Sequence, residues 1–228
     1  MEIEVRDQGV FSLAIVRLEP SEEFVSEAGA LYRSTSNVEV DVTTKSRGQG
    51  GVLSGLKRLV ARETFFFSTY RVRGAEPGEV GLAPTHMGSI RSIEVTPDCG
   101  WLCTGGSYLG SGSGLQLDTQ FQGLKGFLTG ESLSFVTARG SGPLLVSAFG
   151  QLAEVEVDAS LIVDTGHVVA FTEGLQYAID KVGGGWLKTW LSGEGFVLRF
   201  SGRGRILLQS HNPDRLGRLL GPRLPERE

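Results

Sequence analysis

Apolar and polar residues alternate along much of the chain, which is the pattern of strands with one buried face. Every second residue is apolar in residues 38–42, and residues 90–95 and 155–157 are similar. Period-two alternation predicts half-buried β-strands at these places. Residues 161–171 are almost entirely apolar instead. We therefore expect one strand there, with both of its faces covered.

A ten-residue segment recurs twice. Residues 55–64 are matched by residues 123–132 and 186–195, at spacings of 68 and 63 residues. Repetition at such a period indicates a repeated structural unit. After each copy the chain has an apolar run, a glycine-rich turn and a second apolar run, which predicts a β-hairpin. The paired runs are 65–70 with 80–83, 133–136 with 144–148, and 196–200 with 206–210.

These patterns predict an all-β protein. We expect three tandem copies of one β module. The expected divisions are an N-terminal strand and connector (1–27), three β modules (28–95, 96–160 and 161–212) and a C-terminal tail (213–228).

Helix signals are scarce and lie mainly at the C-terminus. From His211 onward the chain is polar and contains proline. Leu216, Leu219 and Leu220 have the spacing of one helical face, which predicts a short amphipathic helix of one or two turns. Four arginines make this end basic: Arg215, Arg218, Arg223 and Arg227.

Composition narrows the possible partners. The 228 residues include 33 glycines, and Gly88 and Gly150, for example, each separate an apolar strand from the next. Such dispersed glycine is typical of short strands with tight turns. A net charge of −4 disfavours nucleic acid, which needs clustered Lys and Arg. The N-terminus lacks the basic-then-apolar order of a signal peptide, so we expect a cytoplasmic location.

The three copies repeat two charged residues. The glutamates could bind a hard cation on an axis, but we favour turn carboxylates that accept backbone N–H groups. The lysines could form an anion-binding ring, but we favour solvated edge charges. Arg62 replaces the glycine of the other two copies and would be strained at positive φ. The repeated residues are Glu63, Glu131 and Glu194, with Lys57, Lys125 and Lys188.

No catalytic, cofactor-binding or metal-ligating set stands out. His86, His167 and His211 lie in separate contexts, although a Ser-His-Asp triad can assemble from distant positions. Residues 110–114 have Gly112 where a nucleophile elbow needs serine. We interpret that run as a loop entering the second module, and not as a phosphate cradle.

The two cysteines are close in sequence. On one strand, Cys99 and Cys103 would lie about 13 Å apart, too far for a disulfide unless the chain bends at Gly100. No second cysteine or histidine pair completes a zinc site. We therefore expect two reduced thiols and no metal.

Several of these segments together resemble a known family. They are residues 55–58, 63–66, 163–170, 193–196 and 207–210. They are similar to bacterial proteins related to a mitochondrial biogenesis factor of the altered-inheritance-of-mitochondria type. The resemblance covers about residues 28–212. It implies a fold similar to the tryptophan RNA-binding attenuation protein: three tandem β-sandwich modules, similar to double-stranded β-helix units, arranged about a pseudo-threefold axis. It brings no established catalytic residues.

One glycine-rich, weakly basic loop is a candidate interaction site. Its apolar and basic residues are compatible with an anionic membrane surface or a protein partner. We therefore expect a non-enzymatic scaffold or interaction protein, and one version of this hypothesis places it at the periphery of a membrane. The sequence leaves open whether the protein forms a homo-oligomer. The alternatives are a small-ligand or RNA-binding module and a metal-dependent enzyme, which dispersed histidines disfavour. The candidate residues are Val52, Leu53, Leu56, Lys57 and Arg58.

Overall fold

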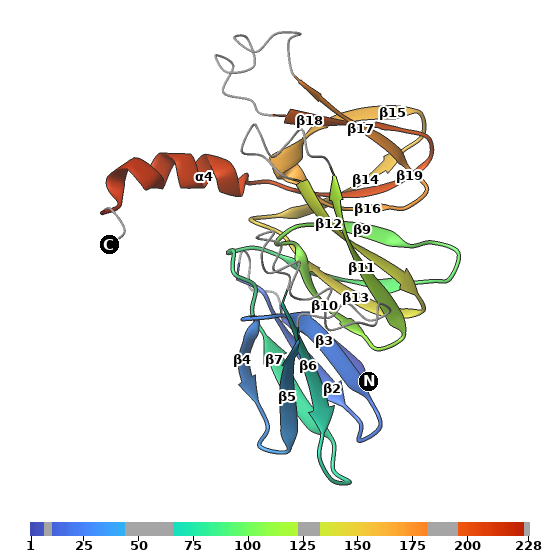
Figure 1. Cartoon of the computed structure of the whole chain (residues 1–228), viewed down its shortest axis with the longest axis vertical. Coiled ribbons are helices and arrows are strands. Elements are labelled where there is room, and N and C mark those ends of the chain that lie inside the picture. The colour runs from blue at the N-terminus through green and yellow to red at the C-terminus, as the bar shows by residue number, and fades with distance from the viewer. Residues whose placement is uncertain (7–10, 44–65, 123–132, 182–195, 226–228) are drawn as a thin grey trace, which may run out of the picture.

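The computed structural model describes residues 1–6, 11–43, 66–122, 133–181 and 196–225. In this part of the chain nearly all regular structure is antiparallel β-sheet, so the all-β prediction is confirmed. These strands form four sheets, which are distributed over the length of the molecule (Figure 1).

The two end sheets are the smaller ones. Sheet 1 has the order β1 (Glu2–Arg6), β2 (Leu13–Leu18), β7 (Gly78–Leu82), β4 (Leu31–Ser34). Sheet 4 has the order β15 (Ser160–Asp164), β18 (Phe196–Ser201), β17 (Gln176–Lys181).

The two inner sheets have six strands each. Sheet 2 has the order β5 (Val38–Thr43), β6 (Phe67–Val72), β3 (Glu23–Glu27), β10 (Tyr108–Gly112), β13 (Gly142–Ser147), β8 (Ile90–Val95). Sheet 3 has the order β11 (Leu115–Gln122), β12 (Leu133–Gly140), β9 (Trp101–Thr104), β16 (Val168–Thr172), β19 (Gly204–Gln209), β14 (Leu152–Val157).

Hydrophobic clusters fill the spaces between successive sheets. One cluster joins Val16 of sheet 1 to Phe24 of sheet 2. A second, which contains the buried Trp101, lies between sheets 2 and 3. A third joins Phe171 of sheet 3 to Phe200 of sheet 4. Sheets 2 and 3 are therefore covered on both faces, which explains why their strands are so apolar.

The glycine-containing loops that were expected to close hairpins join strands of different sheets. β6 and β7 lie in sheets 2 and 1, β12 and β13 in sheets 3 and 2, and β18 and β19 in sheets 4 and 3. The hairpin prediction is therefore wrong. Residues 144–147 of β13 are all buried, so this strand needs partners on both sides and cover on both faces. Gly140 and Gly142, with φ of 121° and 139°, allow the chain to change sheets at this corner.

The apolar stretch 161–171 is not one strand. It forms β15, then a short 3-10 helix η1 (Thr165–His167), then β16, and the two strands belong to different sheets. Asp164 ends β15, because its side chain accepts a hydrogen bond from the backbone N–H of Gly166 at 2.9 Å. Every residue of β16 is buried, as expected for a strand covered on both faces.

Strand pairing crosses the expected module boundaries. β8, in the first expected module, pairs with β13 in the second. β9 and β14, in the second expected module, pair respectively with β16 and β19 in the third. The three-module division and its threefold axis stay predictions. The repeated lysines, by which the axis could be located, lie outside the described residues.

Candidate interaction surface

A helix at the C-terminus projects from the side of the stacked sheets (Figure 1). It is α4 (Pro213–Leu220), and it confirms the short amphipathic helix predicted from leucine spacing. Proline occupies the first turn, where no helical N–H bond is lost. The Asn212 side-chain oxygen accepts from the backbone N–H groups of Asp214 and Arg215, at 2.9 and 3.3 Å. This N-cap starts the helix locally.

The first turn of α4 is held to the sheets by a polar cluster. Asn212 is only 8% exposed, and its amide nitrogen donates to Asp164 Oδ1 at 3.3 Å. Asp164 Oδ2 lies 3.8 Å from Arg215 Nη2. A side chain on Gly166 would overlap the Asn212 amide, so glycine permits the close approach. The root of the helix is therefore fixed by residues of η1 and β15.

Two histidines pack beside this root. The rings of His211 and His86 lie 5.2 and 5.5 Å from the ring of Phe149, measured between centroids. The backbone N–H of His211 also donates to the Phe149 carbonyl at 3.1 Å. The third histidine, His167, has Nδ1 2.8 Å from the carbonyl oxygen of Gln209, so this nitrogen carries the proton and donates.

The histidines therefore serve packing and backbone bonding. His211 Nδ1 lies 2.9 Å from Ser210 Oγ, but among the contacts of the described residues no carboxylate bonds to any of the three rings. The triad that spacing alone left open is not assembled here. Phe149 and Asn212, which organise the cluster, carried no functional signal in the sequence. Only their neighbours in space reveal them.

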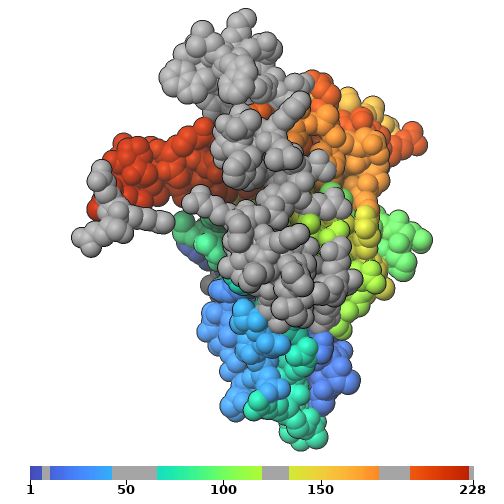
Figure 2. All heavy atoms as spheres, in the orientation of Figure 1, coloured from blue at the N-terminus to red at the C-terminus, as the bar shows by residue number. Residues whose placement is uncertain are grey.

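Beyond its root, α4 contains no buried residue. Leu219 and Leu220 are 57% and 44% exposed, and Leu224, just past the helix, is 65% exposed. Figure 2 shows the helix standing clear of the body on the visible face. At 3.6 residues per turn, Leu216 shares a face with Leu219 and Leu220, and Arg218 lies on the opposite side. The helix thus presents an apolar stripe on one side, with Asp214 and Arg218 together on the other.

The interaction loop expected from sequence lies outside the described residues. The same holds for the repeated glutamates and lysines and for Arg62. These positions are Val52, Leu53, Leu56, Lys57, Arg58, Glu63, Glu131, Glu194, Lys125 and Lys188.

The glycine run 110–114 is not a loop. Residues 108–112 form β10 and are all buried. A side chain on Gly110 would overlap the ring of Phe24, so the glycine makes room for core packing. The interpretation as a loop entering a second module is wrong, because small residues here serve sheet packing and not chain reversal.

The Cys103 thiol does not have the environment of a reactive cysteine. Cys103 is buried on β9, and burial raises the pKa of its thiol to about 12. Cys99 is partly buried, and both thiols are free. Across the described ranges, no group of three or more His, Cys, Asp or Glu side chains is placed to hold a metal ion.

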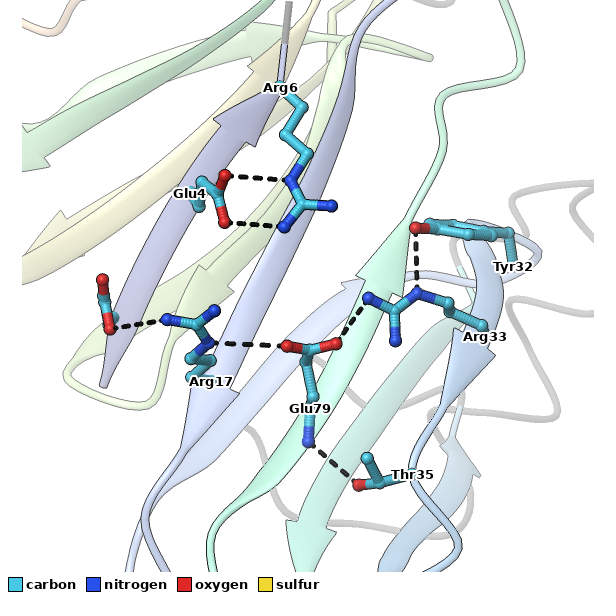
Figure 3. Close-up of polar contacts among 8 residues, drawn as sticks. Glu4, Arg6, Arg17, Tyr32, Arg33, Thr35 and Glu79 are labelled. Carbon is cyan, nitrogen blue, oxygen red and sulfur yellow. Dashed lines mark hydrogen bonds and ion pairs between the residues drawn. The ribbon is translucent and has the colours of Figure 1, made fainter.

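The outer face of sheet 1 carries a row of alternating charges (Figure 3). Arg17 Nη1 lies 3.3 Å from Glu2 Oε2, and Arg17 Nε lies 3.4 Å from Glu79 Oε2. Arg33 binds the other oxygen of Glu79. The row crosses all four strands, and its two acidic residues match its two arginines. It is therefore a self-paired, solvated surface and a poor docking site.

The Glu79 carboxyl should titrate at low pH. The Arg33 hydrogen bond holds the pKa of Glu79 below its ordinary value. The pair therefore stabilises the fold above that ordinary pKa, and its contribution is lost as pH falls through the lowered pKa. Exposure keeps the stabilisation small. We expect Arg33→Gln to raise the pKa of Glu79 in an NMR titration, and Arg71→Gln, which removes a pair to Glu23 on sheet 2, to leave it unchanged.

Comparison with known proteins identifies the family. The model of the mitochondrial biogenesis AIM24 family matches residues 3–211. The chain belongs to the AIM24 family. It is 28% identical to an uncharacterised protein of Streptococcus pyogenes serotype M6 over 221 residues, which are 94% of this chain and 88% of that one. An X-ray structure of a Streptococcus pyogenes protein superposes with a TM-score of 0.82 at 26% identity, covering 98% of this chain and 99% of that one.

These matches confirm the family resemblance seen in the sequence. The attenuation-protein-like fold that it implied stays a prediction. The names of these two Streptococcus pyogenes proteins state no reaction, ligand or partner. The α4 helix begins after residue 211, where the family match ends. In the described part of the chain, no helix combines the length and apolar character needed to cross a bilayer.

Proposed function

We propose that this AIM24-family chain is a non-enzymatic scaffold or interaction protein, and that α4 is its contact element. One observation carries the proposal: a helix held at its root by polar contacts presents an apolar stripe that contains no buried residue in the described part of the chain. Contiguous exposed apolar surface on a soluble fold is characteristic of interaction sites.

The energetic argument supports a contact role. Burying a leucine side chain fully is worth about 1.5–3 kcal/mol. The fold makes only part of this gain from Leu219, Leu220 and Leu224, which remain 57%, 44% and 65% exposed. A partner that covers this stripe would recover part of that free energy. The rigid root adds to the advantage, because little freedom is lost when a preorganised element binds.

The described residues offer little for catalysis. The histidine rings are used in packing and backbone bonds. The pKa of the buried Cys103 thiol is raised to about 12, which keeps it protonated and unreactive near neutral pH. No described feature favours the small-ligand or RNA-binding alternative, and the net charge of −4 opposes the latter.

Site-specific crosslinking in the native host tests the proposal. A photoreactive residue replaces Leu219 in one variant of the full chain and Ile162, which is 53% exposed on β15, in the other. We expect protein or lipid adducts at position 219 that exceed those at position 162. Equal labelling at the two positions would show that α4 is not the contact element.

A further inference from the structure

We infer that the chain associates with copies of itself head to tail, by pairing strand β15 of one copy with strand β4 of the next. The inference goes beyond the proposed function, because it uses two sheet edges and not α4. In the described part of the chain, β4 and β15 each have a strand on one side only, and they lie toward opposite ends of the molecule (Figure 1). An edge with free backbone N–H and C=O groups is a template for another strand.

The two inner sheets show how such edges are joined within the chain. Each inner sheet consists of two groups of three strands. In sheet 2 the group β5-β6-β3 is joined to the group β10-β13-β8 by antiparallel pairing of β3 with β10. In sheet 3 the group β11-β12-β9 is joined to the group β16-β19-β14 by antiparallel pairing of β9 with β16. We call these two contacts the internal junctions.

Each end sheet contains one half of this arrangement. Sheet 4 has the order β17-β18-β15, which corresponds to β5-β6-β3 and β11-β12-β9, and it stops at β15. Sheet 1 contains β4-β7-β2, which corresponds to β10-β13-β8 and β16-β19-β14. β15 therefore has the position of β3 and β9, and β4 has the position of β10 and β16. Pairing of β15 with β4 of another copy would form a third junction of the same kind.

A shared irregularity supports the position given to β4. The register against the neighbouring strand shifts once in each of β4, β10 and β16: between Leu31 and Arg33, between Tyr108 and Gly110, and between Val168 and Ala170. The residues that follow these shifts are Ser34, Ser111 and Phe171. At the internal junctions, Ser111 pairs with Val25 of β3 and Phe171 pairs with Leu102 of β9. Ser34 is the corresponding residue of the free edge.

The partner of Ser34 follows from the register of β15. Leu102 pairs with Thr137, three residues before Gly140, and Ile162 pairs with Arg199, three residues before Gly202. Gly140 and Gly202 both have positive φ, 121° and 102°, at the ends of their strands. Ile162 thus corresponds to Leu102. The internal junctions therefore predict that Ile162 of one copy lies opposite Ser34 of the next.

Apolar residues are exposed at both free edges where the internal junctions bury them. Ile162 is 53% exposed, whereas its counterpart Leu102 is 6% exposed. Tyr32, at the register shift of β4, is 45% exposed, whereas its counterparts Leu109 and Val169 are 1% and 0% exposed. A second copy would cover this apolar surface, which is the main favourable contribution to association. The free edges therefore fit each other.

The β4 edge also has a polar part. Arg33 takes the place of Gly110 and Ala170 and pairs with Glu79 on the outer face of sheet 1. Permanent interfaces are more apolar than this, so we expect an association that depends on concentration. Because two different edges meet, each copy keeps one edge free for another. Such a contact forms a ring where the rotation closes and a filament where it does not.

Disulfide crosslinking between two variants of the full chain tests the pairing. Ser34→Cys and Ile162→Cys are each made with Cys99→Ser, which removes the partly buried native thiol. Directly opposite residues of antiparallel strands have Cβ atoms about 4.5–5.5 Å apart, so a disulfide can form. We expect mild oxidation to link the two variants when they are mixed, and to link neither with itself. A chain with both cysteines should give a ladder of linked multimers.

Light scattering provides a second measurement. The unaltered chain should have a mean mass above 24.5 kDa that rises with concentration. Ile162→Lys should lower the association constant about tenfold or more, because the burial of one isoleucine is lost and a charge enters the edge. Ile179→Lys is the matched control, since Ile179 is 43% exposed on β17, the other edge of sheet 4. It should leave the mass unchanged, and both variants should keep the circular dichroism spectrum of the unaltered chain.

Three results would overturn the inference. One is a monomer at every concentration. Another is equal dissociation by the changes at positions 162 and 179. The third is a disulfide between two Ile162→Cys chains that forms as readily as the mixed one, which would mean that like edges meet. All three leave the role of α4 standing, because its test counts adducts with molecules other than this chain, whereas a photoreactive residue at position 162 should label another copy.

Discussion

Gly88→Ala should destabilise the protein by about 2–5 kcal/mol. A methyl group on Gly88 would overlap the carbonyl oxygen of Ala148 and lie 2.6 Å from the backbone nitrogen of Gly150. Both neighbours are main-chain atoms, so no side chain can rotate away. The two segments would have to separate, which would weaken the parallel bridge between Gly88 and Gly150 and the hydrogen bond from Ser89 N to Gly150 O. Urea unfolding followed by tryptophan fluorescence measures the loss.

The same substitution elsewhere provides the control. Gly217 lies inside α4 with no atom within 4 Å of the position that a methyl group would occupy. Gly217→Ala should therefore leave the urea midpoint unchanged and increase helix content slightly, since alanine favours a helix by about 1 kcal/mol over glycine. Similar unfolding midpoints for the two variants would show that the contact at Gly88 does not limit stability.

Phe171→Ala should cost about 3–5 kcal/mol, the usual range for a buried aromatic side chain. Phe171 is completely buried on β16, in the cluster between sheets 3 and 4. Its ring meets those of Phe135, Tyr177 and Phe200 at centroid distances of 5.7, 5.1 and 5.0 Å, all edge-to-face. Truncation removes the three contacts together and leaves a cavity that these rigid neighbours cannot fill.

Phe11 gives a matched control, because this residue is 62% exposed. Phe11→Ala should change stability by no more than about 0.5 kcal/mol. Thermal unfolding of both variants and of the unaltered chain measures the two losses of stability. A loss below about 1 kcal/mol for Phe171→Ala would mean that the cluster between sheets 3 and 4 contributes little to the cooperative fold.

Local pattern predicted the strands better than their partners. Alternation in residues 38–42 and 90–95 correctly indicated β5 and β8. The glycine turns after β6, β12 and β18 were expected to close hairpins, yet each turn carries the chain into a neighbouring sheet. A short glycine-containing turn can have the same residues whether it closes a hairpin or leads into a neighbouring sheet. The choice depends on which distant strands complete the hydrogen bonding, and period-two patterning does not contain that information.

The candidate interaction surface was likewise predictable only in its local features. Leucine spacing and the arginines near the C-terminus predicted an amphipathic helix, because helical periodicity is local. Its fixed root was not predictable, since Asp164 and Asn212 are 48 residues apart and meet only when β15 and β19 are placed. The separate contexts of the histidines left a triad open in the sequence. Only the structure shows that His86 and His211 pack on Phe149 and that His167 bonds to the Gln209 carbonyl.

By itself the sequence determined the all-β class, the acidic balance, the family and the leucine-striped C-terminal helix. Each of these follows from composition or from contacts between near neighbours in the chain. The tertiary structure decided that sheets 2 and 3 are covered on both faces and that Gly88 lies against Gly150. It also decided that α4 projects from the sheets without a buried residue. These features depend on contacts between residues that are distant in sequence, whose free energy is set only when the whole chain packs.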